Sequence, residues 1–207
     1  SIWSERFEGF FIIFYDNASS SMRKEIFKKF WEFFIYKVVI VRQDENSTVI
    51  DTFLPYDTQI CNSIEPVEIA RLEDPATSEI ASLFPHKFSN FNACNITITT
   101  FDSEAIFHVD SHLRGRDIDL IVTLADTLNF TLDLDYMTTV GSWGMIYSNG
   151  TITGAFKKLV DRKTSMAIGN YYLKLDRAMI MDHSMVYEFD TMIFIIPHQR
   201  KLNSLRK

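Results

Sequence analysis

The chain has 207 residues, of which 46% are hydrophobic and 23% are charged, a balance typical of folded globular proteins with one large or two small domains. The net charge is -6 and the sequence has no dense run of Lys and Arg, so it lacks the basic surface typical of a nucleic-acid-binding protein. No apolar run approaches the roughly 20 residues that cross a bilayer, since Lys37 interrupts the closest one at 33–41. The 18 Phe residues predict a thick core in preference to a partner surface.

The first quarter of the sequence predicts a small α/β layer. Residues 10–15 are a compact apolar run typical of a strand, and the hydroxyls at 19–21 are candidate caps for the helix that follows. Residues 36–41 and 48–53 then alternate as strands around a polar turn at 43–46. The expected apolar face of the helix consists of Met22, Ile26, Phe27, Phe30, Phe33 and Phe34.

Between residues 54 and 92 the periodicity weakens and prolines punctuate a stretch of mixed polarity. This pattern predicts an irregular connection, with one short helix near 77–83. It is also the best candidate for a domain boundary.

After Cys94 the pattern alternates strands and helices, which predicts a largely parallel sheet covered on both faces. Strands at 95–101 and 131–136 flank a helix that opens at Asp117, which together form a βαβ unit. An Asn-Gly pair at 149–150 predicts a hairpin. Further along we expect helices at 155–160 and 176–181 and strands at 165–168 and 191–196.

Two features favour the secretory side of the cell. The chain contains glycosylation sequons, two or three of which we expect to be used, and its even count of two cysteines is consistent with one disulfide or with a free buried pair. It begins with Ser and shows no signal-peptide pattern, which we interpret as a mature product or an excised fragment. The candidate glycosylation sites are Asn17, Asn46, Asn95 and Asn149, whereas a fifth sequon, at Asn129, lies in a helical pattern where a glycan is awkward.

No enzyme, metal or cofactor motif stands out. The polar residues Glu104, His108, Asp110 and His112 match no familiar metal spacing, and a polar loop explains them. GxSxG, P-loop and GxGxxG runs are absent from the sequence. We therefore expect no metal, no cofactor and no catalysis.

The segment 113–131, with the run Leu113-Arg114-Gly115-Arg116-Asp117-Ile118-Asp119-Leu120, resembles the first ligand-binding segment of ionotropic glutamate receptors and of the divergent ionotropic receptors of insects. Later landmarks follow in the expected order. They are Gly141-Ser142-Trp143-Gly144, residues 149–154, Leu159-Val160-Asp161, Ala167-Ile168-Gly169, Arg177 and Asp182-His183-Ser184.

The amino-terminal half adds a narrower resemblance to the region ahead of that segment in insect receptors. It rests on residues 52–56, Phe84-Pro85 and the two cysteines. The resemblance implies that Cys61 pairs with Cys94.

The resemblance also implies ligand contacts. In glutamate-gated relatives an arginine eight residues after a strand-ending glycine grips the ligand carboxylate, and Gly169 and Arg177 keep that interval. The Pro-Leu-Thr positions of the family read Asn170, Tyr171 and Tyr172 here, which argues against glutamate or glycine and favours a differently shaped amine or carboxylate. The candidate ligand-binding residues are Arg177, Tyr172, Asn170 and Phe107.

The expected fold class is α/β: a periplasmic-binding-protein-like lobe with a mostly parallel sheet at residues 93–198, preceded by a reduced amino-terminal α/β domain with its connection at 1–92. Residues 199–207 are interpreted as a linker toward a first membrane helix. The resemblance implies the extracellular part of a chemosensory cation-channel subunit in a tetramer, at the extracellular face of the plasma membrane. Two alternatives stay open: a vestigial-cleft co-receptor or structural subunit, and a fragment of a soluble solute-binding protein.

Overall fold

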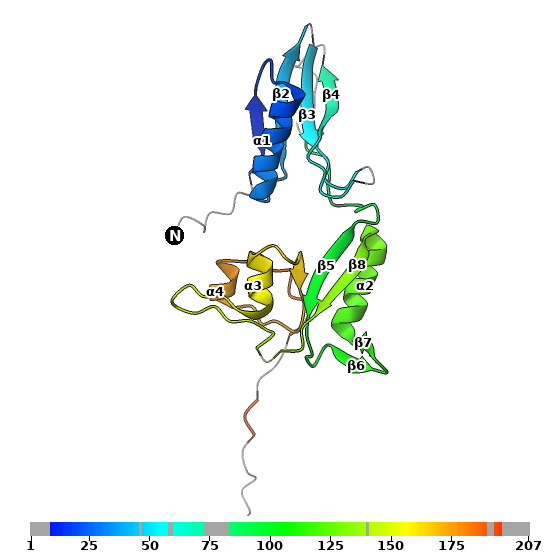
Figure 1. Cartoon of the computed structure of the whole chain (residues 1–207), viewed down its shortest axis with the longest axis vertical. Coiled ribbons are helices and arrows are strands. Elements are labelled where there is room, and N and C mark those ends of the chain that lie inside the picture. Colours follow the sequence, from blue (N-terminus) through cyan, green and yellow to red (C-terminus); the bar gives the residue numbers. More distant parts are fainter. Residues whose placement is uncertain are drawn as a thin grey trace, which may run out of the picture.

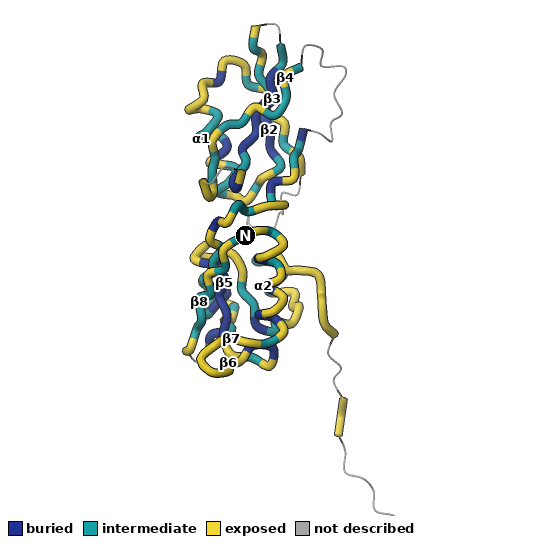
Figure 2. The backbone as a smooth tube through the Cα atoms, turned by 90° about the vertical axis from the view of Figure 1, so that its right-hand side faces the viewer, coloured by how far each residue is buried: buried dark blue, intermediate teal, exposed yellow. Residues whose placement is uncertain are grey.

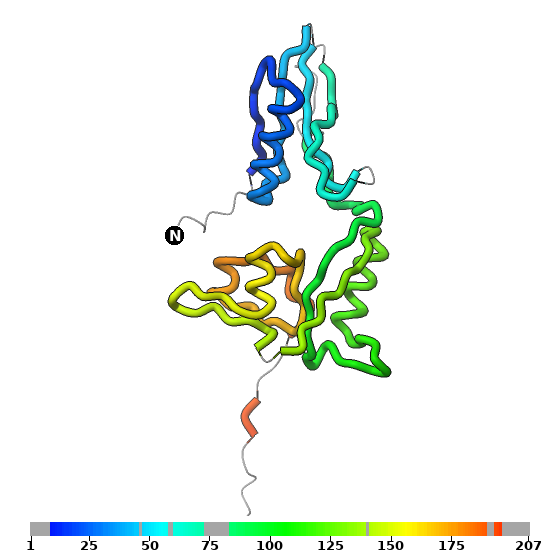
Figure 3. Tube along the Cα trace, in the orientation of Figure 1, coloured from blue at the N-terminus to red at the C-terminus, as the bar shows by residue number. Residues whose placement is uncertain are grey.

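The structure is a computed structural model that describes residues 9–45, 47–57, 60–72, 83–139, 141–189 and 193–195. The chain forms an upper α/β part and a lower α/β part, seen one above the other in Figure 1. It passes from the upper part to the lower part along one side, as the trace in Figure 3 shows. The fold is therefore mixed α/β, as the sequence predicts.

The upper part is one mixed sheet in the order β1-β2-β3-β4. Strand β1 (Phe11–Phe14) pairs parallel with β2 (Val38–Asp44), which pairs antiparallel with β3 (Ser47–Phe53). Strand β4 (Pro66–Leu72) closes the order antiparallel to β3. The three strands predicted for this region are confirmed.

Helix α1 (Ser20–Glu32) covers one face of this sheet (Figure 1). The Ser19 hydroxyl accepts a hydrogen bond from the Met22 backbone N–H at 3.3 Å, so the predicted cap is confirmed. The predicted apolar face is only partly right: Phe27 is buried, but Phe33 and Phe34 follow the helix end and are exposed.

Strand β4 corrects the expectation of an irregular connection over residues 54–92. The prolines of this stretch argue against a strand, yet Pro66 is the first residue of an edge strand, where no further strand needs its missing N–H. Most of the short helix expected at 77–83 lies outside the described residues, and Leu83 itself is buried against Val39 and Ile50.

The lower part is built on a parallel sheet in the order β8-β5-β9. Strand β5 (Asn95–Thr100) is the centre, and β8 (Thr131–Tyr136) and β9 (Met166–Ala167) pair parallel to its two edges. Helix α2 (Arg116–Leu128) joins β5 to β8, which confirms the βαβ unit. Helix α3 (Gly154–Val160) lies on the other side of the sheet from α2, near the short helix α4 (Leu175–Ala178) (Figure 1).

Smaller elements complete the lower part. The Asn-Gly turn is confirmed, since Ile146 and Ile152 form an antiparallel bridge around it. A hairpin of β6 (Phe107–Val109) and β7 (His112–Arg114) was not predicted, because its strands are too short to show a periodicity. The strand expected at 191–196 is wrong where it is described: Ile193, Phe194 and Ile195 are in no strand and are exposed, and the remaining positions lie outside the described residues.

Burial follows the two sheets. In Figure 2 the buried positions gather along β2, β3 and β5, while most of the described residues after α4 are exposed. Within the described part of the chain, no helix is both long and apolar enough to cross a membrane.

The two parts are tied together beside the connection. A disulfide joins Cys61 to Cys94, the pairing that the family resemblance implies, with the two Cα atoms 5.6 Å apart. A row of aromatic rings runs across the same place, from Trp31 over Phe88 and Phe91 to Phe130. These links hold the end of the upper part against the start of β5.

Lys87 is a buried amine in the upper part. Its Nζ donates a hydrogen bond to Thr52 Oγ1 at 2.8 Å and lies 3.9 Å from the centroid of the Phe53 ring. Among the described residues no carboxylate lies within ion-pair distance of it; the buried carboxylate of Asp51 pairs with Arg23 and Arg42 instead. Burial lowers the pKa of Lys87 to about 7.

The disulfide predicts a measurable loss of stability when it is removed. Closing a loop of 33 residues restricts the unfolded chain, so the double variant Cys61→Ser/Cys94→Ser should lose about 3–4 kcal/mol of unfolding free energy. Urea unfolding measures the loss, and the reduced wild type is the matched control, which should behave like the double variant. An oxidised wild type no more stable than the variant would contradict this role.

Lys87 predicts a pH dependence of stability. Between pH 7 and the ordinary lysine value of 10.5 the unfolded chain binds a proton that the folded chain does not, so the unfolding free energy should rise with pH over this window, by roughly 2–5 kcal/mol in total. Lys87→Met should remove most of this pH dependence. At pH 6–7 it should raise the unfolding free energy by about as much as the wild type gains between pH 7 and 10.5. Lys28→Met, at an exposed position of α1, is the control and should keep the rise. Parallel pH profiles for wild type and Lys87→Met would contradict the prediction.

Candidate functional site

The candidate site lies at the carboxyl edge of the lower sheet. Strand β5 continues into Phe101 and Asp102, and β8 continues into residues 137–139. The chain crosses from β8 on one edge of β5 to β9 on the other, which makes this edge a switch point where open α/β sheets bind ligands. A pocket of about 460 Å³ opens here.

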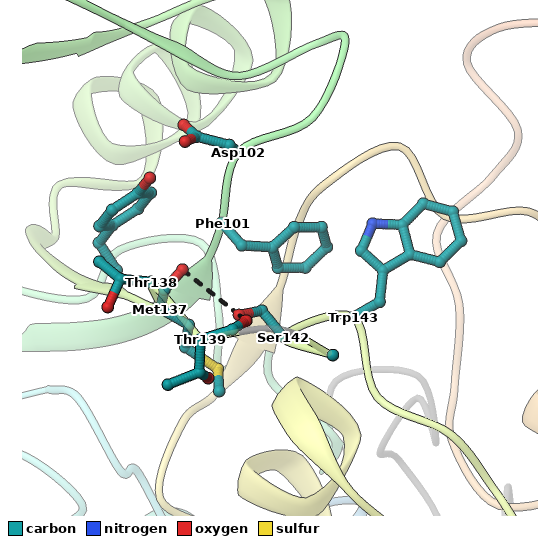
Figure 4. A pocket seen from close by; sticks show the side chains of 9 residues that line it. Phe101, Asp102, Met137, Thr138, Thr139, Ser142 and Trp143 are labelled. Atoms are coloured by element: carbon teal, nitrogen blue, oxygen red, sulfur yellow. Dashed lines mark hydrogen bonds between the residues drawn. The ribbon is translucent and has the colours of Figure 1, made fainter.

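The pocket combines aromatic walls with hydroxyl groups (Figure 4). The Ser142 hydroxyl donates to the carbonyl oxygen of Met137 at 3.4 Å and to that of Thr139, which fixes the loop after β8. In Figure 4 the Phe101 ring points from β5 toward Trp143, and the Asp102 carboxylate lies at the opposite side of the site. The lining residues are Phe101, Asp102, Tyr136, Met137, Thr138, Thr139, Gly141, Ser142 and Trp143.

A close approach between Gly169 and Phe101 positions the back of the pocket. Gly169 follows β9 with φ +148°, and a Cβ added to it would lie 2.5 Å from Cζ of Phe101. Only glycine leaves room for the ring there. Gly169, which the family resemblance placed at the end of the strand, therefore also leaves the space that the Phe101 ring occupies at the pocket wall.

Five rings form an aromatic cluster next to the pocket, defined as Phe101, Trp143, Phe156, Tyr171 and Tyr172. Neighbouring ring centroids lie between 5.0 and 6.1 Å apart. Tyr171 is at its centre, where its hydroxyl donates to the Trp143 carbonyl oxygen at 3.1 Å. Burial raises the pKa of Tyr171, and the nearby Arg177 opposes the rise, so this phenol stays protonated and acts as a packing residue.

Arg177 lies against this cluster. Its guanidinium carbon is 5.0 Å from the ring centroid of Phe156 and 5.7 Å from those of Trp143 and Tyr171, distances at which a cation and a ring attract. Its Nη1 donates to the Tyr172 carbonyl oxygen at 2.9 Å. The guanidinium is therefore held beside the pocket by α4 and the cluster, but it does not line the pocket.

The opposite side of the pocket is anionic. Asp102 Oδ1 lies 3.3 Å from His108 Nδ1, and the His108 ring meets the Tyr136 ring edge-on at 4.7 Å. Desolvation and then the hydrogen bond to the Asp102 carboxylate raise the pKa of Tyr136. Asp102, Tyr136 and His108 thus form one polar group at this rim.

The predicted ligand residues fall into two groups. Arg177 and Tyr172 touch each other beside the pocket, and Tyr172 as a residue is 54% exposed. Asn170 and Phe107 line a second pocket of about 430 Å³ near the start of α2. The structure does not bring all four residues to one cavity.

Asp117 organises the second pocket. It is 1% exposed, and its carboxylate accepts the Asn170 backbone N–H at 3.2 Å and the Tyr187 hydroxyl at 3.1 Å. Arg116 beside it forms an ion pair with Glu188. The segment after α4 is therefore pinned to the first turn of α2. The lining residues are Glu104, Ala105, Phe107, Gly115, Arg116, Asn170 and Glu188.

The sequon asparagines Asn17, Asn95, Asn129 and Asn149 are exposed in the structure, and Asn46 lies outside the described residues. Exposure leaves room for a glycan, and the use of Asn17, Asn46, Asn95 and Asn149 stays a prediction. Within the described residues no group of three or more His, Cys, Asp or Glu side chains could hold a metal ion.

Sequence reasoning missed most of the pocket. Asp102, Met137 and the loop to Trp143 directly follow two strands that were predicted correctly. Parallel strands bring their carboxyl ends to one edge of the sheet. The predicted strand ends near residues 100 and 136 therefore indicated where the pocket lies. The contribution of Trp143 depends on a long loop whose path no local pattern encodes.

Comparison with known proteins finds a match to a protein-family model. A family model described as "Putative ionotropic receptor, ligand binding domain" matches residues 3–90. No curated protein matches the chain significantly. The match confirms the resemblance to ionotropic receptors, and it covers the upper part and the connection, where the sequence carries the narrower likeness, rather than the lower part that holds the pocket.

The Gly169–Phe101 contact gives a prediction for the site. Gly169→Ala should displace the Phe101 ring and lower the unfolding free energy by about 2–4 kcal/mol, through backbone strain and overpacking. The matched control is Gly150→Ala, with φ +83° and no atom within 4 Å of an added Cβ, which should cost about 1 kcal/mol. Urea unfolding measures both, and near-ultraviolet circular dichroism should change only for Gly169→Ala. Equal effects of the two variants would contradict the close packing.

Proposed function

We propose, on the basis that the chain carries a ligand-binding-domain region of the ionotropic receptor family, that it is the ligand-sensing portion of a chemosensory ligand-gated cation-channel subunit. The family is one of receptors, whose ligand-binding domains typically face the outside of the cell. The family match is the observation that carries the proposal. The sequons and the disulfide support an extracellular location.

The lower part, residues 93–198, is proposed to be the first lobe of a periplasmic-binding-protein-like module. Its parallel sheet with helices on both sides and its pocket at the carboxyl edge of β5 support this assignment. One lobe supplies half of a small-molecule cleft. Residues 1–92 then form a reduced amino-terminal domain, and residues 199–207 lead toward a membrane helix.

Within this lobe, Arg177 is proposed to bind a ligand carboxylate. A guanidinium offers a planar fork of donors that matches a carboxylate, and the aromatic cluster holds it next to the pocket. Tyr172, half exposed beside it, is the neighbouring wall. Asn170 and Phe107 are proposed to contact parts of the ligand that extend toward the second pocket.

Signalling would proceed by closure of a second lobe over the pocket. A ligand that touches both lobes binds the closed state more tightly, and this differential affinity pulls the equilibrium toward closure and channel opening. Other subunits of a tetramer would transmit the change. A single lobe makes only part of the contacts, so its own affinity should lie near the millimolar range or weaker, about -4 kcal/mol.

A co-receptor or structural subunit with a vestigial cleft is the second candidate. One observation favours it: the Tyr172 carbonyl and three rings already engage Arg177, so a ligand carboxylate must compete with contacts inside the protein. Such a subunit would function through contacts with its partners.

Nuclear magnetic resonance on the labelled chain separates these functions. Titration with 3-phenylpropionate should shift amide signals of α4 and of the loop from Thr138 to Trp143. Arg177→Gln keeps part of the side chain's packing but removes the charge, and it should weaken this binding by about tenfold or more.

Lys163→Gln is the matched control, because it removes an exposed cation in the turn before β9 and should leave the titration unchanged. Undiminished 3-phenylpropionate shifts in Arg177→Gln would overturn the carboxylate role. A chain that responds to neither carboxylates nor amines would favour the vestigial cleft.

A further inference from the structure

The charge pattern of the first pocket is one-sided. Among the described residues that line it, Asp102 is the one with a formal charge. Arg177 is not among the lining residues, and its guanidinium lies 5.7 Å from the centroid of the Trp143 ring, which separates it from Asp102. Among the described lining residues, a ligand inside the pocket therefore meets a carboxylate, while the nearby guanidinium lies behind the Trp143 ring.

The neutral walls of the pocket suit a positive group with an apolar body. The rings of Phe101, Tyr136 and Trp143 present π-electron faces and edges, and Met137 adds a polarizable thioether. A cation close to aromatic faces is attracted by the ring quadrupole, and tryptophan gives the strongest attraction. The pocket volume of about 460 Å³ accommodates a small organic ligand.

Asp102 keeps acceptor capacity for such a ligand. A carboxylate offers about four lone-pair sites on its two oxygens. The contacts with His108 Nδ1 and with the Tyr136 hydroxyl use part of this capacity and hold the carboxylate at the pocket rim. An ammonium group carries three donors and no acceptor, so it can use the remaining sites, whereas a carboxylate at the same place would meet like charge.

We propose that this pocket binds the ammonium group of an organic amine, held by the Asp102 carboxylate with the rings of Tyr136 and Trp143 around its body. The inference rests on the proposed function and names the ligand class of that same site. The amine subsite is separate from the guanidinium of Arg177, so a simple amine without a carboxylate is sufficient. Because the Asp102 side chain is 66% exposed, water screens the ion pair and the isolated chain binds weakly.

Three probes with the same aromatic body test the ligand class: 2-phenylethylamine, 2-phenylethanol and 3-phenylpropionate. In titrations of the labelled chain, the amine should shift the amide signals of Phe101, Asp102 and Tyr136. The neutral alcohol should bind there at least about fivefold more weakly, because it lacks the charge that the carboxylate recognises. An alcohol as strong as the amine overturns the proposal.

The matched variants are Asp102→Asn and Asp110→Asn. The first keeps the shape of the side chain and removes its charge at the pocket, and it should weaken amine binding by about tenfold. The second removes the same charge in the exposed turn between β6 and β7 and should leave amine binding unchanged. Amine shifts that survive Asp102→Asn overturn the proposal.

If 3-phenylpropionate binds through Arg177 while the amine leaves the pocket signals unchanged, the amine subsite fails and the ligand-sensing function stands. If none of the three probes shifts any pocket signal, both fail. Lys163→Gln, at a residue that lines neither pocket, should leave the amine titration intact, and a loss of amine binding equal to that in Asp102→Asn would contradict the proposal.

Discussion

The parallel pairing of β8 and β9 to the two edges of β5 is the constraint on which the candidate site depends. Parallel strands run in one direction, so the segments that follow all three strands emerge at one edge of the sheet. Asp102, Met137 and Gly169 come from distant parts of the sequence and meet there for this reason alone. The contact of Gly169 with the Phe101 ring then fixes how closely β9 and β5 can approach at that edge.

The upper part contributes through its attachment. The disulfide and the row of rings from Trp31 to Phe130 hold the connection against the start of β5, at the end of the strand opposite the pocket. The family match covers this upper part, while the pocket lies in the lower one. A second contact joins the two parts away from the connection, because the guanidinium of Arg162 lies 4.5 Å from the Phe34 ring centroid.

Much of the fold could be predicted from local patterns, because the apolar periodicities of β5, α2 and β8 are strong and uninterrupted. Local sequence patterns gave wrong predictions where the position of a residue in the sheet or at a helix end determines its structure. Pro66 argues against a strand in general, yet it is tolerated at the start of an edge strand. Phe33 and Phe34 continue the helical pattern, yet the helix ends before them and leaves both exposed.

The site was predictable only in part. The interval from Gly169 to Arg177 placed Arg177 beside the pocket, but nothing in it shows that the guanidinium packs on three rings instead of lining the cavity. Asn170 lies in the second pocket because its backbone N–H is bound to Asp117, a contact between residues 53 positions apart. Such long-range contacts determine which side chains share a cavity, and local sequence patterns do not encode them.

Small molecules are proposed to bind at the carboxyl edge of β5. Fluorine resonance spectroscopy of the chain labelled with 5-fluorotryptophan tests this proposal directly, because Trp143 lines the pocket and Trp31 lies in the upper part. Added organic amines and carboxylates should move the Trp143 signal and leave the Trp31 signal in place. A Trp143 signal that stays fixed while the Trp31 signal moves would contradict it.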